Sequence, residues 1–390
     1  SIASGSTFTT ANSTFTFTAT TSGKVIYSVV PISFYNVIFN GVGGGWSLIS
    51  TASTGATNTF TMSAGSLTGT GDLNVSSGTM SGSGAITMTA GTVQLSATGN
   101  FGGSTPWSFY NLTFGAGSTD VTSKTGVGST TIAGVLTVAS GQTLNASSTN
   151  WVLTGGGTPF VVNGTFNAQI APFFFTGSSA TIIADESYAA LVLAPSAPGT
   201  PVYTLQGGAL SASSLTLGGT NPVSVNADTD DASISITGNV SIGASSSFTA
   251  SNVGAFNVGG SWSNAGTFTP SGAGVTFNSS DTGETINAGS SPFYNLSFVG
   301  ASGGWTIVEH ATSTNAFTLT SAASFTLSPN KTLAVGGAFT NSVGGSATEW
   351  ATSTLSLYSG SAYSINTKTT GGATYGTLAI VANTDIRSWD

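Results

Sequence analysis

The stretch "GSLTGTGDLNVSSGTMSGSGAITMTAGTVQLSATGNF", residues 65–101, restates one short pattern three times. Each copy opens on a glycine, and an apolar residue follows two positions later, which gives the pairs Gly65 and Leu67, Gly78 and Met80, and Gly91 and Val93. The three glycines are evenly spaced along the chain. A short fixed period of strand and turn is typical of a solenoid, because a single coil cannot bury its apolar face without neighbouring coils.

Apolar residues alternate with Thr or Ser through most of the chain. Clear runs are "TFTFTAT" (14–20), "AITMTA" (85–90), "SASSLTL" (211–217) and "SISITGNVSI" (233–242). A period of two residues is typical of half-buried strands, and Thr favours strands because it is β-branched. Glycine-rich turns end these runs, and no window combines helical spacing with helix caps. The pattern therefore predicts an all-β chain.

The composition supports a folded chain with a hydroxyl-coated surface. Of the 390 residues, 39% are apolar and 10% aromatic, which is enough to bury a core, whereas only 5% are charged. The 13 acids and 5 bases are scattered, and without a basic cluster the chain cannot neutralise phosphates, so we expect no nucleic-acid partner. No window approaches the roughly 18 to 20 consecutive apolar residues of a membrane span.

Two further features of the sequence bear on where the protein is found. The chain has no Cys, which excludes disulfides, thiolate metal sites and Cys nucleophiles. This fits a secreted protein, although a cytosolic protein could also lack Cys. It starts at Ser1 without Met, so we expect either that a signal segment has been removed or that the chain is a piece of a longer polypeptide.

A longer repeat is marked by tyrosines in similar phrases. The clearest phrases are "ISFYNVIFNGVGGGWSL" (32–48), "WSFYNLTFGAGSTDVT" (107–122) and "SSPFYNLSFVGASGGWTI" (290–307). The marker tyrosines are Tyr35, Tyr110, Tyr188, Tyr294 and Tyr375. Their spacing predicts one solenoid over residues 1–390 with four imperfect units, about 32–106, 107–187, 188–291 and 292–374, and terminal strand segments at 1–31 and 375–390. Tandem β-sandwich domains of similar size are the alternative.

Part of the chain resembles a known class of repeats. The strings "GVTFNSSDTGETINAGSSPFYNLSF" (274–298) and "TLAVGGAFTNS" (332–342) look like the repeats of large bacterial β-solenoid surface proteins and adhesins. In those repeats, "VTFNG", "QTI" and "FYNLTI" strands lead into "LTVGGNFTN". The resemblance implies an elongated parallel β-helix displayed outside the cell.

The repeated phrases supply the candidate core residues. We expect Phe to fill the interior, and Asn either to adopt a left-handed conformation or to bond a turn backbone. Binding by the adjacent Tyr is a second possibility. Trp46 and Trp305 each follow a Gly-Gly pair, which favours close packing, although an exposed Trp could stack on a sugar. The repeat-core candidates are Phe34, Tyr35, Asn36, Phe39, Phe109, Tyr110, Asn111, Phe114, Phe293, Tyr294, Asn295 and Phe298.

Groups suited to catalysis or cofactor binding are scarce, and we expect no enzyme and no cofactor. The single His, His310, follows Glu309, and the single Arg, Arg387, lies near the last residue. Asp185 and Glu186 are neighbours, so in a strand they would point to opposite faces. This arrangement does not supply the converging ionisable groups that a triad or a sugar-cleaving site requires.

Two other sites receive weak support. The "NADTDD" segment (226–231) carries Asp228, Asp230 and Asp231 at a spacing that could bind Ca²⁺, but it lacks the Gly and distal Glu of an EF-hand loop, which favours a solvated turn. An ice-binding face would require the Thr runs to be aligned at one coil period, and the sequence suggests that they are not.

The ends of a solenoid expose unpaired strand edges unless they are capped. The sequence has no amphipathic capping helix and no charged edge strand at either end. We therefore expect a structural subunit of an extracellular filament or cell-surface fibre, assembling head to tail into a homopolymer that contacts neighbouring fibres or surface glycans. The alternative is a stalk or adhesin segment of a larger surface protein that binds glycans or other cells. The assembly candidates are Phe15, Phe17 and Trp389.

Overall fold

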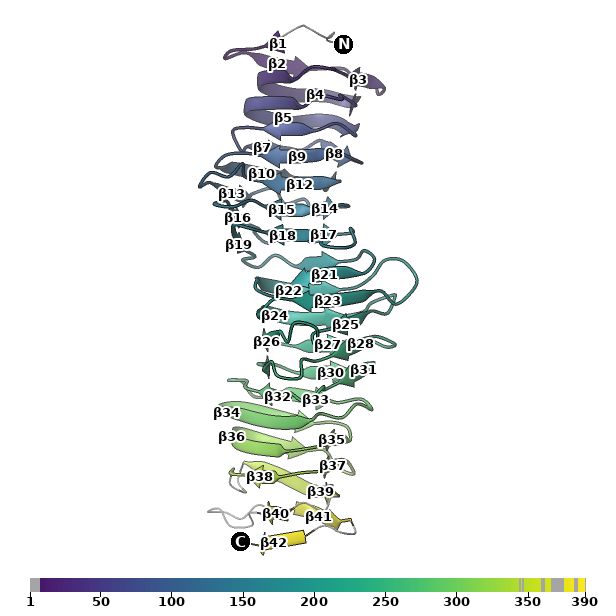
Figure 1. Ribbon diagram of the computed structural model, residues 1–390, viewed down its shortest axis with the longest axis vertical. Helices are drawn as coiled ribbons and strands as arrows, with labels where there is room; N and C mark the ends of the chain where they lie inside the picture. Colours follow the sequence, from purple (N-terminus) through teal and green to yellow (C-terminus); the bar gives the residue numbers. More distant parts are fainter. Residues whose placement is uncertain are drawn as a thin grey trace. The chain divides into compact units, whose positions relative to one another are not determined.

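The computed structural model describes residues 8–343, 345, 347–358, 362–365, 375–381 and 385–389 (Figure 1). These residues form strands and turns without any helix, in a parallel β-solenoid of about 16 turns. The predicted all-β parallel β-helix is confirmed, and the alternative of tandem β-sandwiches is wrong because successive strands pair in parallel from coil to coil. No helix in the described part could cross a membrane.

The chain divides into two compact units. The first consists of Ser1–Ile182 with Ser187–Ala189, and the second of Ile183–Glu186 with Ala190–Asp390. Strands β21 (Ala180–Ile183) and β22 (Ser187–Leu193) contain residues of both. The four repeat units expected from the tyrosine spacing stay a prediction.

Three columns of parallel strands build the first unit, one for each side of the coil. The first column contains β1 (Phe8–Thr9), β4 (Ile32–Leu48), β5 (Thr54–Gly69), β6 (Leu73–Val75), β9 (Thr92–Leu95), β12 (Asn111–Phe114), β15 (Leu136–Val138) and β18 (Phe160–Val162). The second contains β2 (Thr14–Phe17), β4, β5, β7 (Met80–Gly82), β10 (Gly99–Gly103), β13 (Val121–Lys124), β16 (Thr143–Asn145) and β19 (Thr165–Asn167). The third contains β3 (Lys24–Ile26), β4, β5, β8 (Ala85–Met88), β11 (Trp107–Phe109), β14 (Thr130–Ile132), β17 (Trp151–Leu153) and β20 (Phe173–Phe175).

The second unit is built in the same way. One column contains β24 (Ala209–Leu217), β26 (Ser233–Ile236), β29 (Phe256–Val258), β32 (Gly274–Phe277), β34 (Asn295–Ile307), β36 (Phe317–Leu327) and β38 (Phe339–Asn341). Another contains β24, β27 (Val240–Ile242), β30 (Trp262–Asn264), β33 (Glu284–Asn287), β34, β36 and β39 (Thr348–Leu357). On the third side, a first run of paired strands contains β23 (Val202–Gln206), β25 (Ser224–Asn226), β28 (Ser247–Thr249) and β31 (Thr267–Thr269). A second run contains β35 (Ala311–Ser313), β37 (Thr332–Val335), β39 and β41 (Tyr375–Ile380). Separately, β40 (Ala362–Ile365) pairs with β42 (Asp385–Trp389).

The three-sided coil explains the short glycine repeat. One full turn of the coil separates strand partners such as Leu73 and Val93. The three repeated glycines lie at three different corners of the coil, with φ of 81°, 72° and 71°. The apolar residues that follow them belong to the third, second and first columns. Each step of the glycine repeat therefore passes two of the three sides of the coil and is shorter than a full turn.

The interior is a continuous apolar stack of side chains. Along most strands, inward residues are buried and outward residues are at least partly exposed, as in β15, where Leu136 and Val138 are buried and Thr137 is half-buried. Aromatic rings fill much of the interior, and five tryptophans are fully buried: Trp107, Trp151, Trp262, Trp305 and Trp350. Because each coil contacts its neighbours through these rings, the core is shared from coil to coil rather than closed within one.

Candidate functional site

The phenylalanines of the repeated phrases all lie inside the solenoid. Phe34, Phe39, Phe109, Phe114, Phe293 and Phe298 are between 0% and 7% exposed. Of the adjacent tyrosines, Tyr110 and Tyr294 are 41% and 38% exposed, while Tyr35 is half-buried. Each Tyr lies beside a corner, so the phrase brings Phe into the core and turns the chain.

The asparagines of these phrases join one coil to the next. None has a positive φ, so the left-handed alternative does not apply to them. The Asn111 Oδ1 accepts a hydrogen bond from the Val135 amide at 2.9 Å, and the Asn295 Oδ1 accepts one from the Ala316 amide at 3.1 Å. The Asn36 Oδ1 instead accepts from side chains of the following coil.

The phrase is not tied to one side of the coil. Phe34 belongs to the first column and Phe39 to the second, whereas Phe109 belongs to the third column and Phe114 to the first. The same residues therefore build two different corners. The use of two different corners indicates that the phrase has an architectural role, because binding sites repeated along the surface would be expected to face one direction.

The Gly-Gly-Trp segments close two other corners. Trp46 and Trp305 are 3% and 1% exposed, which leaves no ring surface for a sugar. The glycines give the rings room: a Cβ at Gly303 would lie 2.4 Å from the Ser279 carbonyl oxygen and 2.4 Å from the Trp305 ring. Only a residue without a side chain fits this corner.

The acidic segment near residue 230 lies on a turn. Asp228 and Asp231 are half-buried and Asp230 is exposed. The Asp231 carboxylate accepts a hydrogen bond from the Ser251 hydroxyl at 3.0 Å, and the Asp231 φ of 54° marks a turn. Within the described residues, no three side chains of His, Cys, Asp or Glu are grouped so as to hold a metal ion.

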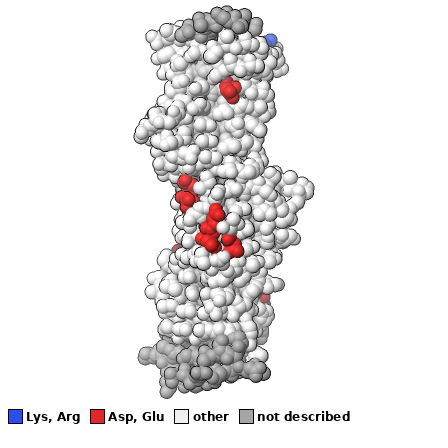
Figure 2. Space-filling model, in the orientation of Figure 1, with Lys and Arg blue, Asp and Glu red and all other residues white. Residues whose placement is uncertain are grey.

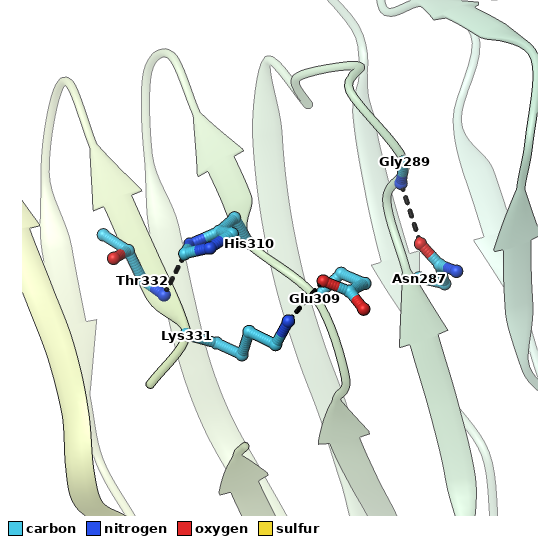
Figure 3. A network of polar contacts seen from close by, with 6 residues as sticks. All are labelled: Asn287, Gly289, Glu309, His310, Lys331 and Thr332. Carbon is cyan, nitrogen blue, oxygen red and sulfur yellow. Dashed lines mark hydrogen bonds and ion pairs between the residues drawn. The ribbon is translucent and has the colours of Figure 1, made fainter. Parts of the chain in front are cut away.

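His310 belongs to an exposed polar network on turns of successive coils (Figure 3). Its Nδ1 accepts a hydrogen bond from the Thr332 amide at 3.1 Å. The neighbouring Glu309 carboxylate pairs with the Lys331 ammonium at 2.5 Å, and that contact lowers the Glu309 pKa. One nitrogen of the imidazole is thus used to fix a turn, and the network links one coil to the next.

Lys124 is a buried group that its sequence context did not reveal. It is 3% exposed, and its register partner in the preceding coil is the buried Phe101. The ammonium donates to the carbonyl oxygens of Gly126 at 2.7 Å and Gly128 at 2.6 Å. Burial lowers the Lys124 pKa to about 8. These contacts hold the corner that follows β13.

Outward polar side chains, most of them hydroxyls, form a row in the second unit. The partners in register are Ser211, Ser235, Asn257, Thr276, Ser297, Thr318 and Thr340. This row has one residue in each coil and is not an alignment of Thr-x-Thr runs, so the expectation that those runs are not aligned stays a prediction. Most of the face drawn in Figure 2 is uncharged, and the few charged side chains on it are mostly acidic.

The first described coil is the most open part of the first unit. Its inward residues Phe15, Phe17 and Ile26 are half-buried, although their partners one coil later, Val37, Phe39 and Leu48, are 3%, 3% and 2% exposed. Outward apolar residues are also exposed here, with Val25 at 59% and Val29 at 40%.

The last described coil of the second unit is open in the same way. Inward Ile380 is 47% exposed, whereas its partner Leu357 is 0% exposed. Leu378 is half-buried, while its partner Leu355 is 1% exposed. The third assembly candidate, Trp389, lies in β42, but its side chain is outside the described part of the chain.

No protein-family model, curated protein or solved structure matches this chain.

Proposed function

We propose that the chain is a structural subunit of an extracellular filament or cell-surface fibre, assembling head to tail through its end coils. The observation that carries the proposal is the half-exposure of inward side chains in the first coil. Phe15 and Phe17 stand in register with the buried Val37 and Phe39. Another coil laid on the first would bury them as every later coil buries its own, which is favourable because apolar surface leaves water.

The backbone of β2 supports the same proposal. The Asn36 amide donates to the Ser13 carbonyl at 3.0 Å, so Ser13 faces β4. Backbone groups of successive strand residues point to opposite sides, so those of Thr14 and Thr16 point away from β4. A strand edge whose backbone N–H and C=O groups point away from its neighbour can pair with an added parallel strand.

A second copy of the chain is the occupant that fits this edge. The contact between coils is already the main interface of the molecule, and the last coil repeats its chemistry with Leu378 and Ile380. Head-to-tail docking keeps all strands parallel, so the second copy would continue the interface that exists inside each unit. The low charge of the chain, 5% of residues, leaves little repulsion between copies or neighbouring fibres.

The proposal is tested by electron microscopy and light scattering of the purified chain, together with a matched pair of variants. Thr16→Pro removes an amide that faces away from β4, whereas Thr16→Val keeps that amide and a β-branched side chain. Uniform fibres from the wild type and Thr16→Val, but not from Thr16→Pro, are expected. Discrete particles at all concentrations would reject self-assembly and favour the stalk or adhesin alternative.

A further inference from the structure

Lys24 occupies an inward position in the first coil. It pairs in register with Trp46, and the same position in the following coils belongs to Leu67, Ile86 and Trp107. These four partners are between 1% and 3% exposed, whereas Lys24 is exposed. The alternation of β3 agrees, since Ile26 is inward and half-buried while Val25 is outward and 59% exposed.

A coil laid on β3 would therefore have to cover an ammonium group. An ammonium buried without partners costs far more than an apolar side chain at the same position gains. The expectation that neither end has a charged edge strand is therefore wrong for β3. An inward-pointing charge on an edge strand is one of the devices that prevent indiscriminate strand addition. The first coil thus presents two phenylalanines that favour stacking in one column and a lysine that opposes it in another.

Lys124 shows how this fold accommodates an inward lysine. It lies in register with Phe101 and is buried, and two turn carbonyls, of Gly126 and Gly128, accept hydrogen bonds from its ammonium. The carbonyls come from the corner that follows its own strand. A lysine can therefore be enclosed between coils when backbone carbonyls meet it, and enclosure lowers its affinity for the proton.

No acid is available near Lys24 within its own part of the chain. Residues 1–71 contain no Asp, Glu, His or Arg, and their other titratable side chains are Tyr27 and Tyr35. Tyr27 follows β3, and Tyr35 lies in β4, the strand paired with it. A carboxylate that pairs with a covered Lys24 would therefore come with the partner.

We propose, resting on the self-assembly proposed above, that Lys24 is a gatekeeper residue: a second copy docks on the first coil only when its end coil brings hydrogen-bond acceptors to the Lys24 ammonium. Coils that present only apolar side chains at this position are rejected. The lysine thereby selects the partner and its register instead of simply blocking the end.

The test compares four proteins at neutral pH: wild type, Lys24→Met, Lys24→Arg and Lys331→Met. The measured quantity is the lowest concentration that gives fibres, from light scattering and sedimentation. Wild type and the Lys331→Met control are expected to share one threshold. Lys24→Met should assemble at a concentration about tenfold lower, because no ammonium then has to be covered. Lys24→Arg should need a higher concentration than wild type, because its larger guanidinium does not fit acceptors placed for an ammonium.

The outcomes separate the two proposals. If wild type assembles and Lys24→Met has the same threshold, the gatekeeper role is rejected while self-assembly stands. If neither wild type nor Lys24→Met assembles, self-assembly itself is rejected, and the gatekeeper role with it. Assembly by Lys24→Met alone would also reject the gatekeeper role, because the lysine would then simply block the end coil of a wild-type chain that does not assemble.

Discussion

Phe39 and Trp46 meet edge to face, with ring centroids 5.1 Å apart and planes at 63°. Phe298 and Trp305 repeat this geometry in the other unit at 5.3 Å and 62°. Each pair forms the two ends of one short segment, "FNGVGGGW" or "FVGASGGW", in which glycines carry the chain around a corner. The repeated phrase therefore encodes a way to turn a continuous strand over a tryptophan ring.

Gly303→Ala should destabilise the second of these corners. The new Cβ would lie 2.4 Å from both the Ser279 carbonyl and the Trp305 ring, so either the backbone or the ring must move. We expect a loss of roughly 1–3 kcal/mol and a lower midpoint of thermal unfolding. Gly219→Ala is the control, because its Cβ would meet only the Ala194 side chain at 3.5 Å. Equal midpoints for the two variants would show that the corner tolerates a side chain.

Asn111→Ala should loosen the contact between two coils. It removes the oxygen that accepts from the Val135 amide, and an unsatisfied, partly buried donor costs about 1–3 kcal/mol. Hydrogen exchange should accelerate at Val135 and its neighbours in β15. Tyr110→Phe is the control at the adjacent position, where the side chain is 41% exposed, and a change within about 0.5 kcal/mol is expected. Unchanged exchange at Val135 in Asn111→Ala would contradict the role given to this amide.

The stability of the first unit should rise with pH above neutrality because of Lys124. In the unfolded chain this lysine keeps its proton up to its ordinary pKa of 10.5, whereas in the folded chain burial lowers the pKa to about 8. The unfolded state then binds more protons between these two values, so the free energy of unfolding increases over this window, by up to about 3 kcal/mol. Well below pH 8 the lysine is protonated in both states, so it does not make the free energy of unfolding depend on pH.

The measurement is denaturant unfolding of wild type and Lys124→Met from pH 7 to pH 10.5. The difference between the two curves isolates the lysine, because Tyr titration is common to both. Lys331→Met, which removes an exposed lysine paired with Glu309, should keep the wild-type slope. A rise of the same size in Lys124→Met would mean that another group is responsible.

The local sequence was enough to predict the strands and turns, but the number of sides of the coil could be determined only from the structure. The glycines at Gly65, Gly78 and Gly91 were recognisable as turns, and the residues two positions later as core. The sequence shows a short fixed period, but it does not show that a coil has three sides, because each corner uses the same kinds of residue. Only the strand register reveals that one period covers two sides.

The two inward lysines show where sequence patterns stop being informative. Around Lys124, the run "VTSKTGVG" alternates apolar and polar residues too weakly to assign a face. Its burial depends on the long side chain reaching two turn carbonyls that follow it in the chain. Lys24 is inward because its strand is in register with Trp46, which lies one full coil later in the chain. Both positions depend on a neighbouring coil, and local alternation carries no such information.

Phe17→Ser should weaken self-assembly if the first coil stacks on another copy. Phe17 stacks on Phe39 with centroids 4.8 Å apart and planes at 10°, so its other face is where the next ring of the column would lie. Replacing this ring removes the apolar surface that docking would bury, and we expect the concentration needed for fibres to rise by about tenfold. Val25→Ser is the matched control: Val25 is more exposed, at 59%, but points outward. We expect less than about a twofold change from it, because outward residues stay in solvent when coils stack. Similar losses in both variants would mean that assembly reflects general surface hydrophobicity, and the end-to-end stacking of coils would be rejected.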